Sequence, residues 1–169
     1  MRNARIKALA LAAVCAALLC APAIAGTASQ LDKLKSLAGD WEATTADGKG
    51  ITKVSFKETA GGSGIVETQT HGAEGGEMLT VYSVDGDDVM LTHFCLAGNA
   101  PRMKAAKASA DGRMLDFVFM DATNLAKPAD GHMSHLKIVF LDSDHFVEEW
   151  TWTENGKSDP KKIQFSRKK

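Results

Sequence analysis

Residues 77–95 read EMLTVYSVDGDDVMLTHFC. Two runs rich in β-branched and aromatic residues flank the pair Asp85-Gly86 in this stretch. Asp-Gly is typical of tight β-hairpins, because glycine accepts the positive φ of the turn and aspartate tolerates it. The stretch therefore predicts two antiparallel strands, over 77–84 and 88–95, joined by a hairpin.

The same alternation of short strand and turn continues along the chain after Gly39. Ten strands that follow one another in hairpins leave two exposed edges unless the sheet closes, so the pattern predicts an all-β, ten-stranded antiparallel up-and-down barrel. A β-sandwich is the alternative, whereas an α/β fold is excluded because no helices separate the strands. The other turn pairs are Asp47-Gly48, Gly61-Gly62, Gly75-Gly76, Asp111-Gly112, Ser143-Asp144 and Asn155-Gly156. The other predicted strands span 40–45, 51–58, 64–71, 101–110, 113–121, 131–141, 145–153 and 161–167, with Pro101, Pro128 and Pro160 at strand starts or in loops.

One short helix is predicted before the first strand. Ser29 is expected to cap it, Leu31 and Leu34 form its apolar stripe, and Gly39 is expected to end it. The expected architecture is thus a barrel preceded by a single short helix.

The N-terminus has the pattern of a Sec-type signal peptide. Arg2, Arg5 and Lys7 precede an uncharged run over 8–21, and Ala23-Ile24-Ala25 supplies the small residues of a cleavage site. That run is shorter than the roughly 20 residues that a membrane-spanning helix needs, so no stable membrane anchor is expected. We therefore predict cleavage after Ala25, a periplasmic or secreted destination, and a single domain over 26–169.

The composition of the mature chain excludes some partners. Loss of residues 1–25 removes three of the 20 basic residues and none of the 21 acidic ones, which leaves a net charge of about −4. A mildly acidic chain with interspersed signs has no electrostatic footprint for nucleic acid. Two of the three cysteines leave with the signal, so Cys95 has no partner in the chain and stability must come from packing.

The start of the first strand carries a family resemblance. The short helix followed by Gly39-Asp40-Trp41 resembles the Gly-x-Trp opening of lipocalins and related calycins. In those families the tryptophan packs across the closed base of the barrel beneath an arginine of the last strand, which implies that Trp41 and Arg167 close this barrel. Residues 91–103 and 130–133 also resemble a group of uncharacterised secreted bacterial proteins, a similarity that implies no activity.

Alternation along the strands predicts which side chains face the barrel interior. His93 shares a face with Leu91, and His132 and Ser134 fall on the apolar face of their strand. An interior with aromatic walls and a few polar groups suits a small hydrophobic or amphipathic ligand; a barrel filled by its own side chains is the alternative. The predicted ligand-binding residues are His93, Phe117, Phe119, His132, Phe140, Phe146, Glu148, Trp150 and Trp152.

Glu148 lies on an otherwise aromatic face, where a carboxylate is costly unless it has a partner. It is a candidate for binding a ligand hydroxyl or amine, or for acting as a base with a raised pKa. It is equally a candidate for an ion pair with Arg102 or Lys104, or for a solvated position at the open end of the barrel.

The histidines raise a metal or haem alternative, although we assign no cofactor. His93 and His132 with Glu148 are the one plausible interior metal set, because His132 and His135 point to opposite faces. The nitrobindin-like haem barrels are similar in size. Their Gly-x-Trp-x-Gly-x-Gly motif and late histidine are not reproduced here, since Ala43 and Thr45 replace the glycines and 161–169 contains no histidine.

An enzymatic alternative is a hydrolase or isomerase that uses Glu148 and a histidine. Nucleophilic catalysis would use Cys95 with His93, or Ser134, but no sequence signal supplies an orienting group or an oxyanion site. No catalytic residue is assigned, and the sequence indicates neither the ligand nor the oligomeric state.

Overall fold

The computed structural model describes residues 27–44, 50–71, 75–106, 109 and 111–169. The predicted signal peptide over 1–25 and the turn Asp47-Gly48 lie outside the described residues, as does Thr45. Export from the cytoplasm therefore stays a prediction.

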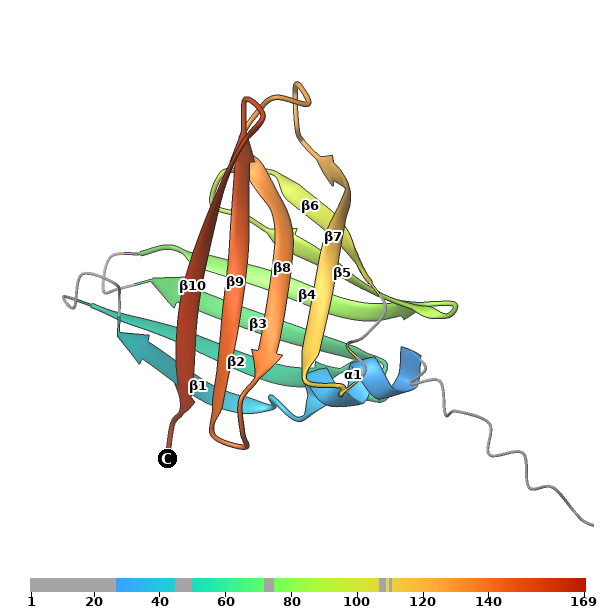
Figure 1. The fold of residues 1–169 in the computed structure, drawn as a ribbon, viewed down its shortest axis with the longest axis vertical. Coiled ribbons are helices and arrows are strands. Elements are labelled where there is room, and N and C mark those ends of the chain that lie inside the picture. Colours follow the sequence, from blue (N-terminus) through green and yellow to red (C-terminus); the bar gives the residue numbers. More distant parts are fainter. Residues whose placement is uncertain (1–26, 45–49, 72–74, 107–108, 110) are drawn as a thin grey trace, which may run out of the picture.

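Ten antiparallel strands form a closed barrel in which each strand pairs with its neighbours in sequence and β1 pairs with β10 (Figure 1). This confirms the predicted up-and-down barrel. Local hairpins explain the order, because every connection joins adjacent strands. The strands are β1 (Gly39–Thr44), β2 (Ile51–Thr59), β3 (Gly64–His71), β4 (Glu77–Asp85), β5 (Asp88–Phe94), β6 (Ala100–Ala105), β7 (Met114–Thr123), β8 (His132–Phe140), β9 (His145–Glu154) and β10 (Lys157–Arg167), with a short 3₁₀ turn, η1 (Ala60–Gly62), between β2 and β3.

The largest boundary differences are in β6 and β10. β6 ends at Ala105, five residues before the predicted end, whereas β10 begins at Lys157, four residues before the predicted start. Asn155 and Gly156 both have positive φ, so they form a two-residue hairpin that pairs Glu154 directly with Lys157. The placement of Pro160 outside a strand is therefore wrong.

The helix α1 (Thr27–Lys35) covers one end of the barrel, where it contacts β2, β4 and β5 (Figure 1). Leu31 and Leu34 are buried against the barrel core. The side chain of Ser29, the predicted cap, lies outside the described residues, so this capping stays a prediction. Gly39 does not end the helix, since it begins β1 after a short turn. The helix seals this end with apolar side chains and leaves the opposite end to loops.

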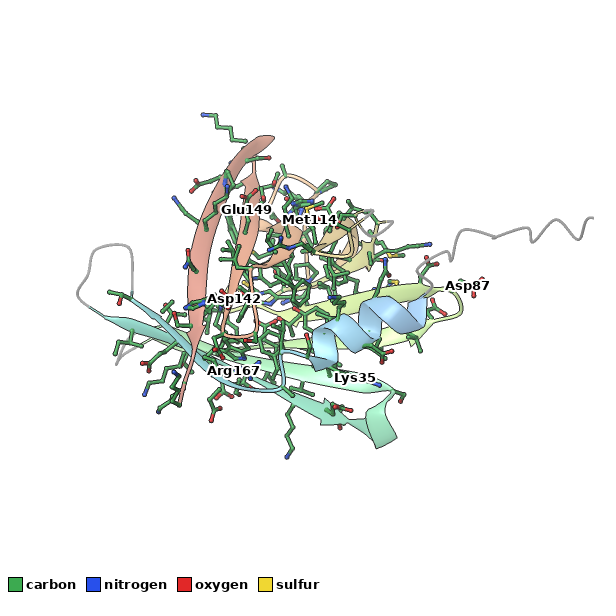
Figure 2. All side chains as sticks on the ribbon, turned by 60° about the horizontal axis from the view of Figure 1, so that its bottom comes forward. Lys35, Asp87, Met114, Asp142, Glu149 and Arg167 are labelled. Atoms are coloured by element: carbon green, nitrogen blue, oxygen red, sulfur yellow. The ribbon has the colours of Figure 1, made fainter. Side chains whose placement is uncertain are left out.

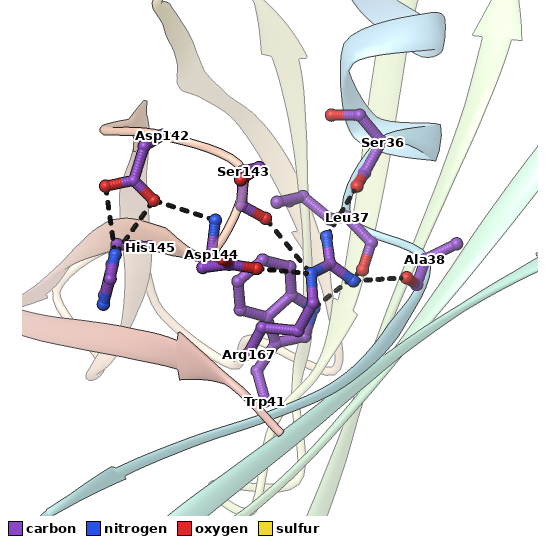
Figure 3. A network of polar contacts seen from close by, with 9 residues as sticks. All are labelled: Ser36, Leu37, Ala38, Trp41, Asp142, Ser143, Asp144, His145 and Arg167. Atoms are coloured by element: carbon purple, nitrogen blue, oxygen red, sulfur yellow. Dashed lines mark hydrogen bonds and ion pairs between the residues drawn. The ribbon is translucent and has the colours of Figure 1, made fainter. Parts of the chain in front are cut away.

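Trp41 and Arg167 close the barrel beside this helix, as the family resemblance implied (Figure 3). The Arg167 guanidinium lies 4.0 Å from the centre of the Trp41 ring. It donates to the carbonyl oxygens of Ala38, Ser36 and Ser143 at 2.9–3.1 Å. The Trp41 indole donates to the Leu37 carbonyl at 2.7 Å. One planar cation thus joins β10, the β8–β9 turn and the end of α1.

We expect Arg167→Lys to lower the free energy of unfolding by about 1–2 kcal/mol, because an ammonium cannot reproduce the planar donor geometry over Trp41. Urea unfolding followed by Trp fluorescence measures the change. Arg102→Lys is the matched control, since Arg102 pairs with Asp121 on the exposed surface, where an ion pair contributes little. Equal losses in the two variants would contradict a closing role for Arg167.

Candidate functional site

A cluster of polar side chains is buried inside the barrel. Figure 2 shows how densely side chains fill the space between the strands. Its members come from strands far apart in sequence, and each has an exposed fraction of 5% or less. Burial of this many polar groups is costly unless they are hydrogen-bonded. The cluster is formed by Glu67 and Gln69 on β3, Thr80 and Tyr82 on β4, His93 on β5, and Glu148 and Trp150 on β9.

Glu67 accepts a hydrogen bond of 2.6 Å from the Tyr82 hydroxyl. Burial raises the pKa of Glu67 from its ordinary 4.5 to about 7, although the polar Tyr82 and Thr80 side chains beside it lower this pKa. The carboxyl is therefore divided between its neutral and charged forms at neutral pH. The pKa of Tyr82 is also raised, first by burial and then by the two nearby carboxyl groups.

Glu148 is fully buried, and its Oε2 accepts from the Trp150 indole at 3.1 Å and from the Gln69 amide at 3.3 Å. Burial, and then the charge of Glu67, raise the pKa of Glu148 well above its ordinary value. Its Oε1 has no hydrogen-bond partner. The suggested pairing with Arg102 or Lys104 is wrong, because those side chains pair with Asp121 and Asp88 at the surface.

His93 contacts two other members of the cluster, Thr80 and Trp150. Its Nδ1 lies 3.0 Å from the Thr80 hydroxyl, and its ring centre lies 4.5 Å from that of Trp150. Its Nε2 is buried and has no partner. Burial lowers the pKa of His93 from 6.5 to about 4, so the imidazole is neutral at neutral pH.

Three of the predicted ligand-binding residues, His93, Glu148 and Trp150, are thus brought together in this cluster. Phe117, Phe140 and Phe146 belong to the hydrophobic core, where Phe140 and Phe146 are register partners on β8 and β9. The ring of Phe117 lies 5.7 Å from Tyr82, and Lys33 of α1 lies over Phe140. These three side chains form the floor beneath the polar cluster.

The remaining predicted residues lie toward the end opposite α1. The rings of Phe119 and His132 are 4.6 Å apart, and Trp152 is half-buried against Gly131, where a Cβ would come within 2.1 Å of its ring. A register shift between Met133 and His135 breaks the alternation of β8, so Met133 packs against the core. The placement of Ser134 on the apolar face is therefore wrong. Its hydroxyl bonds to Thr153 instead.

A groove of about 750 Å³ lies along the seam between β1 and β10. The two strands pair through Trp41↔Arg167 and Glu42↔Ser166 and then diverge (Figure 1). Core-facing Ala43 and Ile163 line this groove. Ile163 is the register partner of Glu148, so one wall residue of the groove neighbours the polar cluster, whose own residues do not line the groove.

Sequence reasoning missed Glu67, Gln69, Thr80 and Tyr82. On β3, Glu67 and Gln69 share a face with Ile65, but the opposite face carries Val66 and two threonines, so polarity alone did not mark the inner face. A usable signal existed for Thr80. The Asp85-Gly86 hairpin places it opposite His93 in the register.

Within the described ranges, no group of three or more His, Cys, Asp or Glu side chains is arranged to hold a metal ion. The set of His93, His132 and Glu148 is not assembled, because His132 lies against Phe119 and bonds to the Asp130 carbonyl. No helix in the described part of the chain is long and apolar enough to cross a membrane. No protein-family model matches the chain, and no curated protein matches it.

Proposed function

We propose that the protein is an exported binding protein that holds one small hydrophobic or amphipathic molecule inside its barrel. Export rests on the signal-peptide pattern of residues 1–25. Binding is supported above all by two buried atoms, Glu148 Oε1 and His93 Nε2, that have no hydrogen-bond partner. An unpartnered buried polar atom costs about 1–3 kcal/mol, and a ligand that supplies the partner recovers this free energy.

Both atoms belong to residues that contact Trp150, so we expect one ligand head group to bind both of them. The aromatic floor beneath the cluster and the groove at the seam favour an apolar body attached to that group. This arrangement, with apolar walls and few polar contacts, is typical of small-molecule sites rather than of macromolecular interfaces.

Saturable binding of the neutral apolar dye Nile red is the first test. We expect a one-to-one complex that Met78→Trp weakens by about tenfold or more, because Met78 is buried on the inner face of β4 and the larger ring fills the interior. Leu79→Trp is the matched control, since the neighbouring Leu79 is exposed on the outer face.

Native mass spectrometry of the protein isolated from its own host complements the dye, because a co-purifying molecule would identify the ligand class. The absence of both a bound molecule and saturable dye binding would refute the proposal. Equal weakening by Met78→Trp and Leu79→Trp would place the dye outside the barrel and also count against it.

A second candidate function is proton transfer, as in a small isomerase or hydrolase. Its specific support is the pKa of Glu67, about 7, since a general acid or base works best when its pKa is near the working pH. Glu67→Gln should then abolish turnover of a substrate while leaving Nile red binding intact. Unchanged turnover in that variant would exclude Glu67 as the base.

A further inference from the structure

The hydrogen-bond donors that face the two buried carboxyl groups already have acceptors. The Tyr82 hydroxyl donates to Glu67, and Gln69 and Trp150 both donate to the same oxygen of Glu148. The second oxygen of Glu148 and the Nε2 of His93 are left open. The cluster therefore presents unfilled positions on a carboxyl group and an imidazole.

The Thr80 hydroxyl, 3.0 Å from His93 Nδ1, can either donate to that nitrogen or accept from it, according to the tautomer of the ring. In the tautomer that carries its hydrogen on Nδ1, the open Nε2 is an acceptor. A ligand that donates a hydrogen bond selects this tautomer and supplies the hydrogen to Nε2.

The charges within the cluster also favour a ligand that donates hydrogen bonds. Two fully buried carboxyl groups lie close enough for the charge of Glu67 to act on Glu148, yet no Lys or Arg among the described residues is buried. The titratable groups of the cluster are Glu67, Tyr82, His93 and Glu148, and the core-facing neighbours from β1, β2, β8 and β10 are Ala43, Thr52, Val54, Ile138 and Ile163. Among the described residues, the interior therefore holds two acidic side chains and no lysine or arginine to pair with them.

From these observations we infer that the site around Glu67, Glu148 and His93 takes the protonated amine of an aliphatic or aromatic amine ligand. This inference rests on the proposed function, which it narrows to one ligand class. A hydroxyl brings one hydrogen, whereas an ammonium brings three and can fill the open positions on Glu148 and His93 together. It also supplies the missing positive charge, and the Trp150 ring beside both residues favours a cation.

We place the entry of such a ligand at the groove along the seam. Its inner wall includes Ala43 and Ile163, next to Glu148, and its rim carries Glu42, Lys161 and Lys162. The rim carries both acidic and basic side chains, so it favours neither cationic nor anionic ligands. Selection for a cation is therefore expected at the inner cluster.

Three probes of equal chain length test the inference by calorimetry: n-octylamine, 1-octanol and octanoate, at about pH 8. We expect octylamine to bind at least about tenfold more tightly than octanol, and octanoate to bind most weakly, because a buried carboxylate pairs with the ammonium and repels the carboxylate. An equal or reversed order of octylamine and octanol would overturn the inference.

Glu148→Gln should bring the affinity for octylamine down to that for octanol and leave octanol within about threefold of its original value. Glu149→Gln is the matched control, because the adjacent Glu149 lies on the outer face and binds Lys162. Nile red binding confirms that both variants keep their barrels. An unchanged preference for octylamine in Glu148→Gln would refute the site.

Proton release gives an independent readout. An ammonium favours the charged forms of Glu67 and Glu148, so octylamine binding should release protons to the buffer and tighten as the pH rises from about 6 to about 8. Octanol binding should do neither. If none of the three probes binds while Nile red does, the amine inference fails and the proposed function survives, whereas failure of all four ligands removes both.

Discussion

Glu67→Gln is expected to gain about 3 kcal/mol of stability relative to the unmodified protein as the pH rises from about 4.5 to about 7. The pKa of Glu67 is raised from 4.5 to about 7 in the folded state, so folding holds its proton more tightly. This contribution favours folding fully below about pH 4.5 and is lost as the pH rises through about 7. Glutamine stays neutral and escapes that loss.

The difference in stability between Glu67→Gln and the unmodified protein must be measured, rather than the stability of the unmodified protein alone. The reason is that burial of His93 changes the stability with pH in the opposite direction. Its pKa is lowered from 6.5 to about 4, so its contribution favours folding above about pH 6.5 and is lost as the pH falls through about 4. The two effects partly cancel in the total stability curve. Subtracting the curve of the variant removes the His93 contribution and leaves that of Glu67, together with the part of the raised Glu148 pKa that the charge of Glu67 causes.

Urea unfolding at a series of pH values provides the free energies for this comparison. Glu149→Gln is the control. The pKa of Glu149 is lowered by its hydrogen bond to Lys162, so its difference curve should be level between about pH 4.5 and 7. A level difference curve for Glu67→Gln would mean that Glu67 is solvated in the folded protein.

Phe146→Ala should lower the free energy of unfolding by about 3–5 kcal/mol, the usual cost of deleting a fully buried phenylalanine. The ring of Phe146 is inaccessible to solvent and contacts three other buried rings, those of Trp41 at 4.8 Å, Phe165 at 5.0 Å and Phe56 at 5.8 Å. Its removal leaves a cavity beneath the closure formed by Trp41 and Arg167, and that cavity cannot collapse without opening the seam.

Phe94→Ala is the matched control for this variant. Phe94 ends β5 with half of its surface exposed, so its truncation should change stability by about 0.5 kcal/mol or less. Both values come from urea unfolding at one pH. A loss below about 1 kcal/mol in Phe146→Ala would show that the floor of the barrel is loosely packed.

The alternation of side chains along a strand predicted the face on which Glu148 lies, but not the groups that it contacts. Its period of two placed Glu148 and Trp150 on the inner face of β9 and Glu149 on the outer face, as the structure confirms. Alternation did not predict the hydrogen-bond partners of Glu148. Arg102 and Lys104 were suggested, but they lie on the outer face of β6. The partners are Trp150 on the same strand and Gln69 on a strand across the barrel.

The two irregular features of the strands differ in whether the sequence indicated them. The register shift near Ser134 moves Met133 onto the core, and no glycine or proline at that point marks a bulge. The early start of β10 was predictable in principle, because Asn155-Gly156 is a two-residue turn that pairs Glu154 with Lys157. Pro160 obscured it, since proline is usually read as a strand boundary.

The strand order, the antiparallel pairing and the inner position of the large rings were determined by the sequence alone. Each depends on neighbours within a hairpin, through turn residues and a side-chain period of two. The tertiary structure alone decided which polar groups meet inside. Gln69 and Glu148 are 79 residues apart, and they touch because the closed sheet curves until β3 faces β9. The charge state of Glu67 is decided in the same way, since its raised pKa arises from burial, and burial exists only once the barrel has closed.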